Sequence, residues 1–237
     1  INRNYGYSWD KAPAGSSSDP EDATYRGPSA FSEPETQAMK KPLTSRKFIY
    51  CMSYHSFSNA ILWPWSYTHE APADKRLALI GNKIAKFAGY KGEQSADLYI
   101  HGGTINDWAF AELGTYTYTS EMGSHQDGFD PPYAKVAQYW KENWPGAQYM
   151  LKTAENPSEA FGPDLEAPLT EGAALLANGA VAAEAFFGKP GTSGTGMALQ
   201  KVGTGFSLPS GGARRLALVH AKDAQGNWGP FTAVWSR

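Results

Sequence analysis

The sequence predicts an α/β domain followed by a small all-β sandwich. In the first part of the 237 residues, short runs of β-forming residues alternate with segments of helical periodicity, as in a sheet covered by helices. After about residue 155 the composition shifts to Ala, Gly, Thr and Ser and ends in a hairpin pattern. We therefore expect two domains, residues 1–155 and 156–237.

The first thirty residues predict a loop region, because they are rich in Gly, Ser, Pro and Asp and contain a turn cluster at residues 14–20. Ser32 and Glu35 then match a capping box, with Ser32 as N-cap and Pro34 in the first turn. We expect a helix that starts here and stops near Pro42.

Alternating strand and helix patterns follow. Residues 48–56 are a nearly continuous apolar run that predicts a strand buried on both faces, with Cys51 as a buried thiol. Apolar spacing in residues 72–90 predicts an amphipathic helix. Residues 115–122 alternate as a strand, and residues 132–143 again predict a helix.

The C-terminal region predicts a hairpin. Two β-prone runs, residues 215–220 and 231–235, flank a polar turn at residues 222–227. The turn, with Trp228 and Pro230 after it, resembles the last hairpin of Ig-like or fibronectin-like modules. A stabilising or spacer role is favoured over ligand binding for such a module.

Charge and hydropathy argue against two kinds of partner. The 21 Lys and Arg residues balance 23 Asp and Glu residues without any basic run, so nucleic acid is not an expected partner. The longest apolar stretch, around residues 173–187, is broken by Gly and Glu and is too short for a membrane span. The single cysteine cannot form an internal disulfide.

A few side chains could carry chemistry. Glu121 lies in a β-prone run, where a buried carboxylate is costly unless it is paired, protonated or bound to a metal. His55 ends a strand and is either a metal ligand or a hydrogen-bonded polar residue. Arg3 either binds a carboxylate or is an exposed loop arginine. His101 and His125 lie in Gly-rich loops and are expected to be solvated.

Several motifs, in this order, resemble the zinc carboxypeptidases of the A, B and T types. They are residues 1–7 with Asn2-Arg3, residues 25–36, His55-Ser56-Phe57-Ser58, residues 98–108 with Tyr99, and the strand that ends in Glu121. Together they span roughly residues 1–145. The resemblance implies a mixed central sheet with flanking helices for this region.

The same resemblance implies roles for individual residues. Glu121 is implied to be the general base for a zinc-bound water, and His55 to be a zinc ligand. The implied substrate-binding residues are Asn2, Arg3, Ser56, Tyr99 and Asn106. Asn2 and Arg3 would bind the C-terminal carboxylate, Tyr99 would cover the substrate, and Asn106, near the pocket floor, suggests a neutral or broad preference.

The zinc site implied by the resemblance is incomplete in this sequence. Catalytic zinc takes three protein ligands, and the family supplies two of them from a His-x-x-Glu motif upstream of the Asn-Arg segment. No His-x-x-Glu occurs in the sequence. We therefore expect a C-terminal portion of the catalytic domain, whose N-terminal part is missing or is a separate chain, and negligible hydrolysis by this polypeptide alone.

The sequence thus predicts a secreted, bacterial-type zinc carboxypeptidase that hydrolyses the C-terminal peptide bond of peptides and proteins. Two alternatives remain open. One is a peptidase of the same fold that acts on cell-wall peptides containing diaminopimelate or D-residues. The other is a non-catalytic homologue that binds peptides without the metal.

Overall fold

A mixed four-stranded sheet forms the centre of the N-terminal region. The structure is a computed structural model and describes residues 1–166, 174–209 and 213–236. The strand order is β1 (Tyr50–His55), β4 (Tyr116–Glu121), β2 (Ala60–Trp63) and β3 (Lys91–Gln94). β4 runs parallel to β1 and antiparallel to β2, and β3 runs parallel to β2. The predicted α/β fold with a mixed sheet is confirmed.

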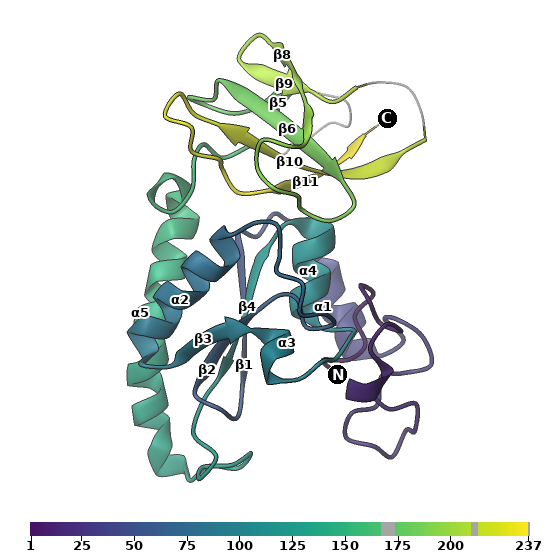
Figure 1. Cartoon of the computed structure of the whole chain (residues 1–237), viewed down its shortest axis with the longest axis vertical. Coiled ribbons are helices and arrows are strands. Elements are labelled where there is room, and N and C mark those ends of the chain that lie inside the picture. The colour runs from purple at the N-terminus through teal and green to yellow at the C-terminus, as the bar shows by residue number, and fades with distance from the viewer. Residues whose placement is uncertain (167–173, 210–212, 237) are drawn as a thin grey trace.

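Helices cover both faces of this sheet (Figure 1). Helices α2 (Arg76–Ala88) and α5 (Val136–Glu155) pack together on one side, and α1 (Pro34–Ser45) and α4 (Ile105–Leu113) lie on the other. The short helices are η1 (Pro13–Gly15), α3 (Ser95–Leu98), η2 (Tyr133–Lys135) and η3 (Pro157–Glu159). None of the helices in the described residues is long and apolar enough to cross a membrane.

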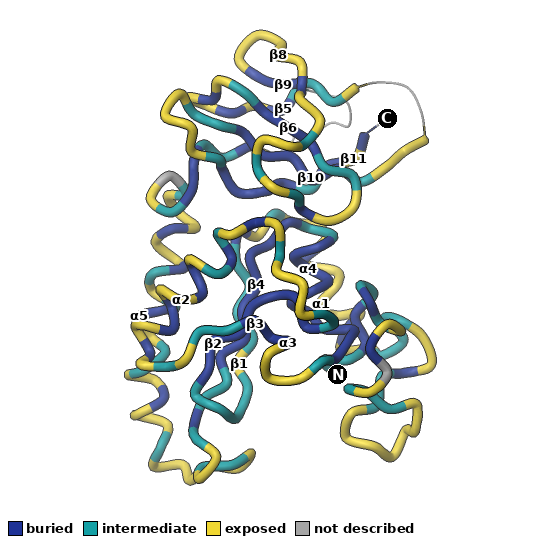
Figure 2. Tube along the Cα trace, viewed as in Figure 1, coloured by how far each residue is buried: buried dark blue, intermediate teal, exposed yellow. Residues whose placement is uncertain are grey.

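The core lies along β4 and α4, where Figure 2 shows continuous burial. Trp108 and Phe110 of α4 and Tyr116 and Tyr118 of β4 are all fully buried. Each buried aromatic side chain stabilises the fold by about 1.5–3 kcal/mol, so this layer fixes the two elements that reach the candidate site.

Two helices differ from the sequence expectation. Ser32 does not cap α1, because its hydroxyl donates to Glu33 Oε1 and accepts from Asn4 Nδ2, and Glu33 occupies the N-cap position. The helix also continues through Pro42 to Ser45. Similarly, α5 runs past the predicted end at residue 143 and through Pro145 to Glu155. Both prolines are tolerated inside these helices.

Strand β1, which the sequence predicts to be buried on both faces, is instead partly exposed. β1 lies at an edge of the described sheet and pairs there only with β4. All its residues are partly or fully exposed, and Tyr54 is 48% exposed. Cys51 is half-buried rather than buried, and burial raises the pKa of its thiol to about 11, which makes it unreactive.

The described residues after Glu155 form two antiparallel sheets and no α-helix. One sheet has the order β11-β10-β6-β7 and the other β5-β9-β8. Their bounds are β5 Leu175–Leu176, β6 Ala182–Phe187, β7 Met197–Ala198, β8 Gln200–Val202, β9 Gly205–Ser207, β10 Arg215–Lys222 and β11 Thr232–Ser236. The predicted hairpin is present, since β10 pairs with β11. An Ig-like fold and the boundary at residue 156 stay predictions.

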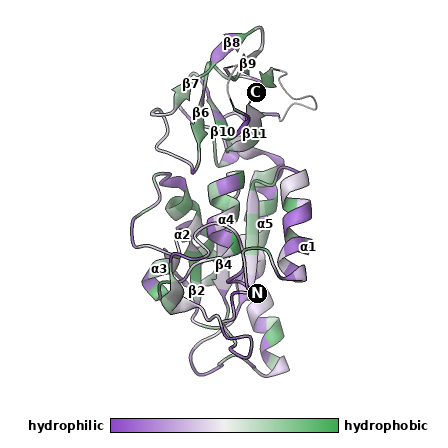
Figure 3. Ribbon diagram, turned by 90° about the vertical axis from the view of Figure 1, so that its right-hand side faces the viewer, coloured by the Kyte–Doolittle hydropathy of each residue, from purple (hydrophilic) through white to green (hydrophobic). Residues whose placement is uncertain are grey.

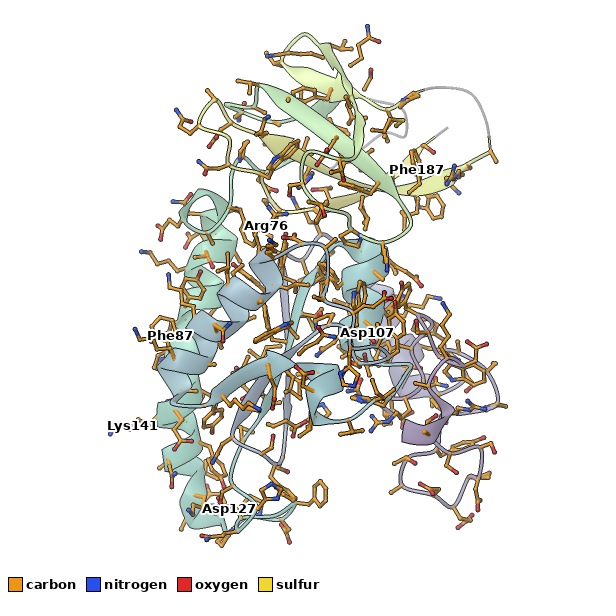
Figure 4. The ribbon with its side chains drawn as sticks, in the orientation of Figure 1. Arg76, Phe87, Asp107, Asp127, Lys141 and Phe187 are labelled. Carbon is orange, nitrogen blue, oxygen red and sulfur yellow. The ribbon has the colours of Figure 1, made fainter. Side chains whose placement is uncertain are left out.

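These β-sheets lie at one end of the N-terminal region, beyond the ends of its helices, as Figures 1 and 3 show. Arg76 (Figure 4) makes the main polar connection. Its guanidinium pairs with Asp74 (2.7 Å) and donates to the carbonyls of Trp228 (2.7 Å) and Gly229 (2.8 Å). Phe231 packs directly on Gly114, whose φ of 71° ends α4. The two regions are therefore joined by buried polar and apolar contacts.

Candidate active site

Strands β1 and β4 end side by side, so that their carboxyl ends lie at the same end of the central sheet. Because the two strands are parallel and in register, His55 pairs with Glu121 at their carboxyl ends. A pocket of about 310 Å³ opens beside these carboxyl ends. Its walls contain every residue that the sequence motifs indicated, namely Asn2, Arg3, His55, Ser56, Tyr99, Asn106 and Glu121. Segments far apart in the chain therefore converge on one site.

Arg3 lies at the wall formed by the N-terminal segment. Its Nε donates to the Gly15 carbonyl (2.8 Å), its Nη1 to the Asn2 carbonyl (2.6 Å) and its Nη2 to the Tyr99 hydroxyl (2.7 Å). Asn2 accepts from the backbone N–H of Ile105 (2.9 Å), the first residue of α4. The amide of Asn2 and the guanidinium of Arg3 are thus oriented before any ligand binds.

Asn4 holds this segment in place, although the sequence motifs did not indicate it. It is fully buried, and its Nδ2 donates to the carbonyls of Arg26 (2.7 Å) and Ser29 (2.8 Å). Its Oδ1 accepts from Glu33 N (3.1 Å) and Thr36 Oγ1 (2.7 Å). Nothing in the local sequence separates Asn4 from Asn2, since their partners are distant in the chain.

His55 and Glu121 are both partly buried, and their protonation equilibria shift accordingly. Burial lowers the pKa of His55, and the positive charges of Arg3 and the N-terminus lower it further. Burial raises the pKa of Glu121 above its usual value, against an opposing effect of Arg3. His55 Nε2 lies 2.8 Å from Ser53 Oγ. Ser56 donates weakly to the Phe129 carbonyl, at 3.4 Å.

The pocket floor is built on the first turn of α4. Thr104 caps this helix by accepting from Asp107 N, at 3.1 Å. The Asp107 carboxylate (Figure 4) accepts from the backbone N–H of Ser66 at 2.9 and 3.0 Å, which fixes the loop after β2. Asn106, on the same turn, is 2% exposed and donates to Thr119 Oγ1 at 2.8 Å.

The expectation of a solvated His101 is wrong, whereas His125 is exposed as expected. His101 is 5% exposed and lines the pocket. Its ring stacks on Tyr99 with centroids 4.3 Å apart, and its Nδ1 donates to the Tyr99 carbonyl at 2.9 Å. The glycines around it allow the loop to fold back over the pocket, which the composition alone does not reveal.

The donor set for zinc is incomplete in the described part of the chain. These residues contain no group of three His, Cys, Asp or Glu side chains that could hold a metal ion. His55 supplies one imidazole, whereas a catalytic zinc site uses three protein ligands. The described residues alone therefore do not fit the ion, and we assign no reaction step to a metal.

Comparison with known sequences identifies relatives of the N-terminal region. A family model described as zinc carboxypeptidase matches residues 1–146. A zinc carboxypeptidase of Saccharothrix mutabilis subsp. capreolus is 31% identical over 113 residues, which cover 44% of this chain and 26% of the relative. Carboxypeptidase O of Homo sapiens is 33% identical over 148 residues, which cover 57% of this chain and 39% of the relative. The chain thus spans between a quarter and two fifths of these relatives.

Solved structures show the same fold. Thrombin activatable fibrinolysis inhibitor matches with a TM-score of 0.58 and 24% identity, over 66% of this chain and 42% of that one. Carboxypeptidase A from Helicoverpa armigera matches with a TM-score of 0.56 and 22% identity, over 67% and 42%. At this identity the likeness supports the fold alone. Neither the cell-wall alternative nor the non-catalytic alternative gains support from these relatives.

Proposed function

The chain belongs to the zinc carboxypeptidase family, and from this premise we propose that its pocket binds the C-terminal residue of a peptide or protein for hydrolysis of the last peptide bond. One observation carries the proposal. Arg3, His55 and Glu121 come from three separate segments, and all three line the same pocket. A cation, an imidazole and a carboxylate around one cavity suit the recognition and cleavage of a carboxylate-terminated chain.

The proposed carboxylate anchor is Arg3 with Asn2. A guanidinium binds a carboxylate through parallel N–H bonds, which gives both strength and orientation. Asn2 uses its oxygen to accept from Ile105 N, so its amide N–H groups are the ones available to a substrate. Tyr99 lines the pocket, is 46% exposed and would cover the bound residue.

Glu121 is the proposed proton-transfer group. A carboxylate at the wall of the pocket can accept a proton from the attacking water and deliver it to the leaving amine. Its partial burial strengthens it as a base relative to a solvated carboxylate. His55 is the proposed metal ligand, in keeping with the zinc of the family, and Ser56 a further substrate contact.

The test compares ligands that differ only at the C-terminus. N-acetyl dipeptides with a free carboxylate and the same dipeptides as C-terminal amides are titrated into the chain by calorimetry. We expect the carboxylates to bind at least about 10-fold more tightly, as charge-assisted hydrogen bonds require. Equal binding of the two forms, or binding of neither, would contradict the proposal.

A second measurement tests the catalytic part. Where hydrolysis of these peptides is measured with zinc and with the expected N-terminal part supplied, Glu121→Gln is expected to lower kcat by about 100-fold or more while leaving ligand affinity within about twofold. Retained hydrolysis in this variant would contradict the role of Glu121. Secretion belongs to the same proposal, and detection of the protein outside the cytoplasm of its native host tests it.

A further inference from the structure

The lining of the pocket includes a buried hydrogen-bond acceptor without a partner. Asn106 uses its Nδ2 to donate to Thr119 Oγ1 at 2.8 Å. Its Oδ1 is buried and has no hydrogen-bond partner in the described part of the protein. Because Asn106 is 2% exposed and lines the pocket, the pocket is the place where a ligand can satisfy this atom.

His101 supplies a second acceptor in the same pocket. Its Nδ1 carries the proton, because it donates to the Tyr99 carbonyl, which can only accept. Burial, and then the charge of Arg3, lower the pKa of His101 to about 4, so the ring is neutral at neutral pH. Its Nε2 therefore keeps a free lone pair, and no described residue donates to it.

The charged side chains that line the pocket already have roles in the proposed function. Among the described residues that line it, Arg3 and Glu121 are the only Lys, Arg, Asp or Glu side chains. Arg3 belongs to the proposed carboxylate anchor and Glu121 to proton transfer. The remaining polar lining consists of neutral groups, including Ser66 and Thr119.

Resting on the proposed function, we propose that this pocket selects peptides whose last side chain is a neutral amide, glutamine or asparagine. The amide has two N–H bonds to donate, and the two pocket-lining residues offer two acceptors without partners, Asn106 Oδ1 and His101 Nε2. A pocket built to hydrogen-bond a substrate group discriminates strongly against analogues that lack it, because its buried polar atoms are then left unpaired.

Other side chains fit less well. Glutamate at neutral pH presents only acceptors to the two acceptors of the pocket. Lysine or arginine brings a cation into a pocket that already holds the Arg3 guanidinium and whose carboxylate, Glu121, is the proposed proton-transfer group. Methionine has the size of glutamine but leaves Asn106 Oδ1 without a donor.

The test uses four N-acetyl dipeptides titrated into the full chain. Three end in glutamine, methionine or glutamate, and the fourth is the glutamine dipeptide with a C-terminal amide. We expect glutamine to bind about 10-fold more tightly than methionine and more tightly still than glutamate. Methionine equal to or tighter than glutamine would overturn the inference.

Two variants assign the effect to the two acceptors. Asn106→Leu is expected to abolish the preference for glutamine over methionine. His101→Phe keeps a ring that can stack on Tyr99 but removes Nε2, and is expected to reduce the same preference. Asn82→Leu, at an exposed position on α2, is the matched control and is expected to keep it. A full preference retained in both pocket variants would contradict the inference.

The same titrations separate the two proposals. If carboxylates and amides bind alike, or nothing binds, the proposed function fails and the inference fails with it. If carboxylates bind better than amides but glutamine and methionine bind alike, the inference alone fails.

Discussion

The guanidinium of Arg3 donates to the hydroxyl of Tyr99 at 2.7 Å, across 96 positions of sequence. The two residues also form a cation–π contact, in which the Arg3 Cζ lies 5.7 Å from the centroid of the Tyr99 ring. The proposed carboxylate anchor and the proposed cover of the pocket are therefore linked in the free protein, and the N-terminal segment is part of the site.

The first prediction concerns Arg3. Arg3→Ala is expected to weaken binding of a carboxylate-terminated dipeptide by about 10- to 100-fold, because a charge-assisted hydrogen-bond pair is lost. Arg3→Lys is expected to recover only part of the affinity, since an ammonium lacks the planar fork. Calorimetry measures both, with exposed Arg46→Ala as control. An affinity within twofold of the parent in Arg3→Ala would contradict the role.

The second prediction concerns Asn4, the buried anchor of the N-terminal segment. Asn4→Ala removes the acceptor of Glu33 N and the donor to the carbonyls of Arg26 and Ser29. We expect the free energy of unfolding to fall by about 2 kcal/mol or more, and the dipeptide affinity to fall with it. Denaturant titration measures the loss, with Asn82→Ala as control. A loss below about 0.5 kcal/mol would show that Asn4 is not the anchor.

The third prediction concerns Arg76, which joins the two predicted domains. Arg76→Met leaves the buried Asp74 carboxylate without its cation and frees two carbonyls of the C-terminal region. We expect a loss of about 3–5 kcal/mol in the free energy of unfolding. Differential scanning calorimetry is expected to show two separated transitions. The control, Lys75→Met, alters an exposed neighbour. A single, unshifted transition in Arg76→Met would contradict this role of Arg76 at the junction.

A buried pair in the C-terminal region makes stability depend on pH. His220 Nε2 lies 2.7 Å from Glu184 Oε1, and both residues are almost fully buried. Burial lowers the pKa of His220, against the opposing effect of Glu184. The pKa of Glu184 is also lowered, because hydrogen bonds from His220, Gly194 and Gly196 outweigh the effect of burial.

The fourth prediction gives the sign of this effect. The unfolded chain protonates His220 near pH 6.5, whereas the folded protein holds it neutral to lower pH. The free energy of unfolding therefore falls as pH drops below 6.5, and His220 accounts for at most about 1.4 kcal/mol of this fall per pH unit. The stabilisation that Glu184 contributes is lost at lower pH, below its unfolded pKa of about 4.5.

The measurement is the melting temperature between pH 7 and pH 5. His220→Gln keeps a donor near Glu184 but does not titrate, so its melting temperature is expected to change less over this range than that of the parent. His125→Gln, at an exposed position, is expected to follow the parent. Identical pH profiles for the parent and His220→Gln would refute the prediction.

Much of the fold follows from local patterns in the sequence. Strand β4 and helix α2 are predicted within a few residues, because alternation and amphipathic spacing are local signals. The ends of α1 and α5 are not, because both helices continue through a proline that tertiary packing accommodates. The position of β1 at the edge of the sheet could not be predicted either, because an apolar run does not indicate whether a strand pairs with one neighbouring strand or with two.

The site divides in the same way. The motifs identified Arg3, His55 and Glu121, whose residue types indicate their chemistry. Asn4 and His101 were missed, because their importance comes from partners that only the folded chain brings near. The roles of all these residues stay predictions until they are tested by experiment.

The order of strands in the central sheet affects how the protein is made. β1 and β2 follow one another along the chain, yet β4 lies between them. While the ribosome is still synthesising residue 115, both strands have an open edge where their shared neighbour belongs, and a premature hairpin between them would have to open again. The sheet is therefore completed only when β4 inserts between β1 and β2, and nascent chains halted before Tyr116 expose two unpaired strand edges, which favour aggregation.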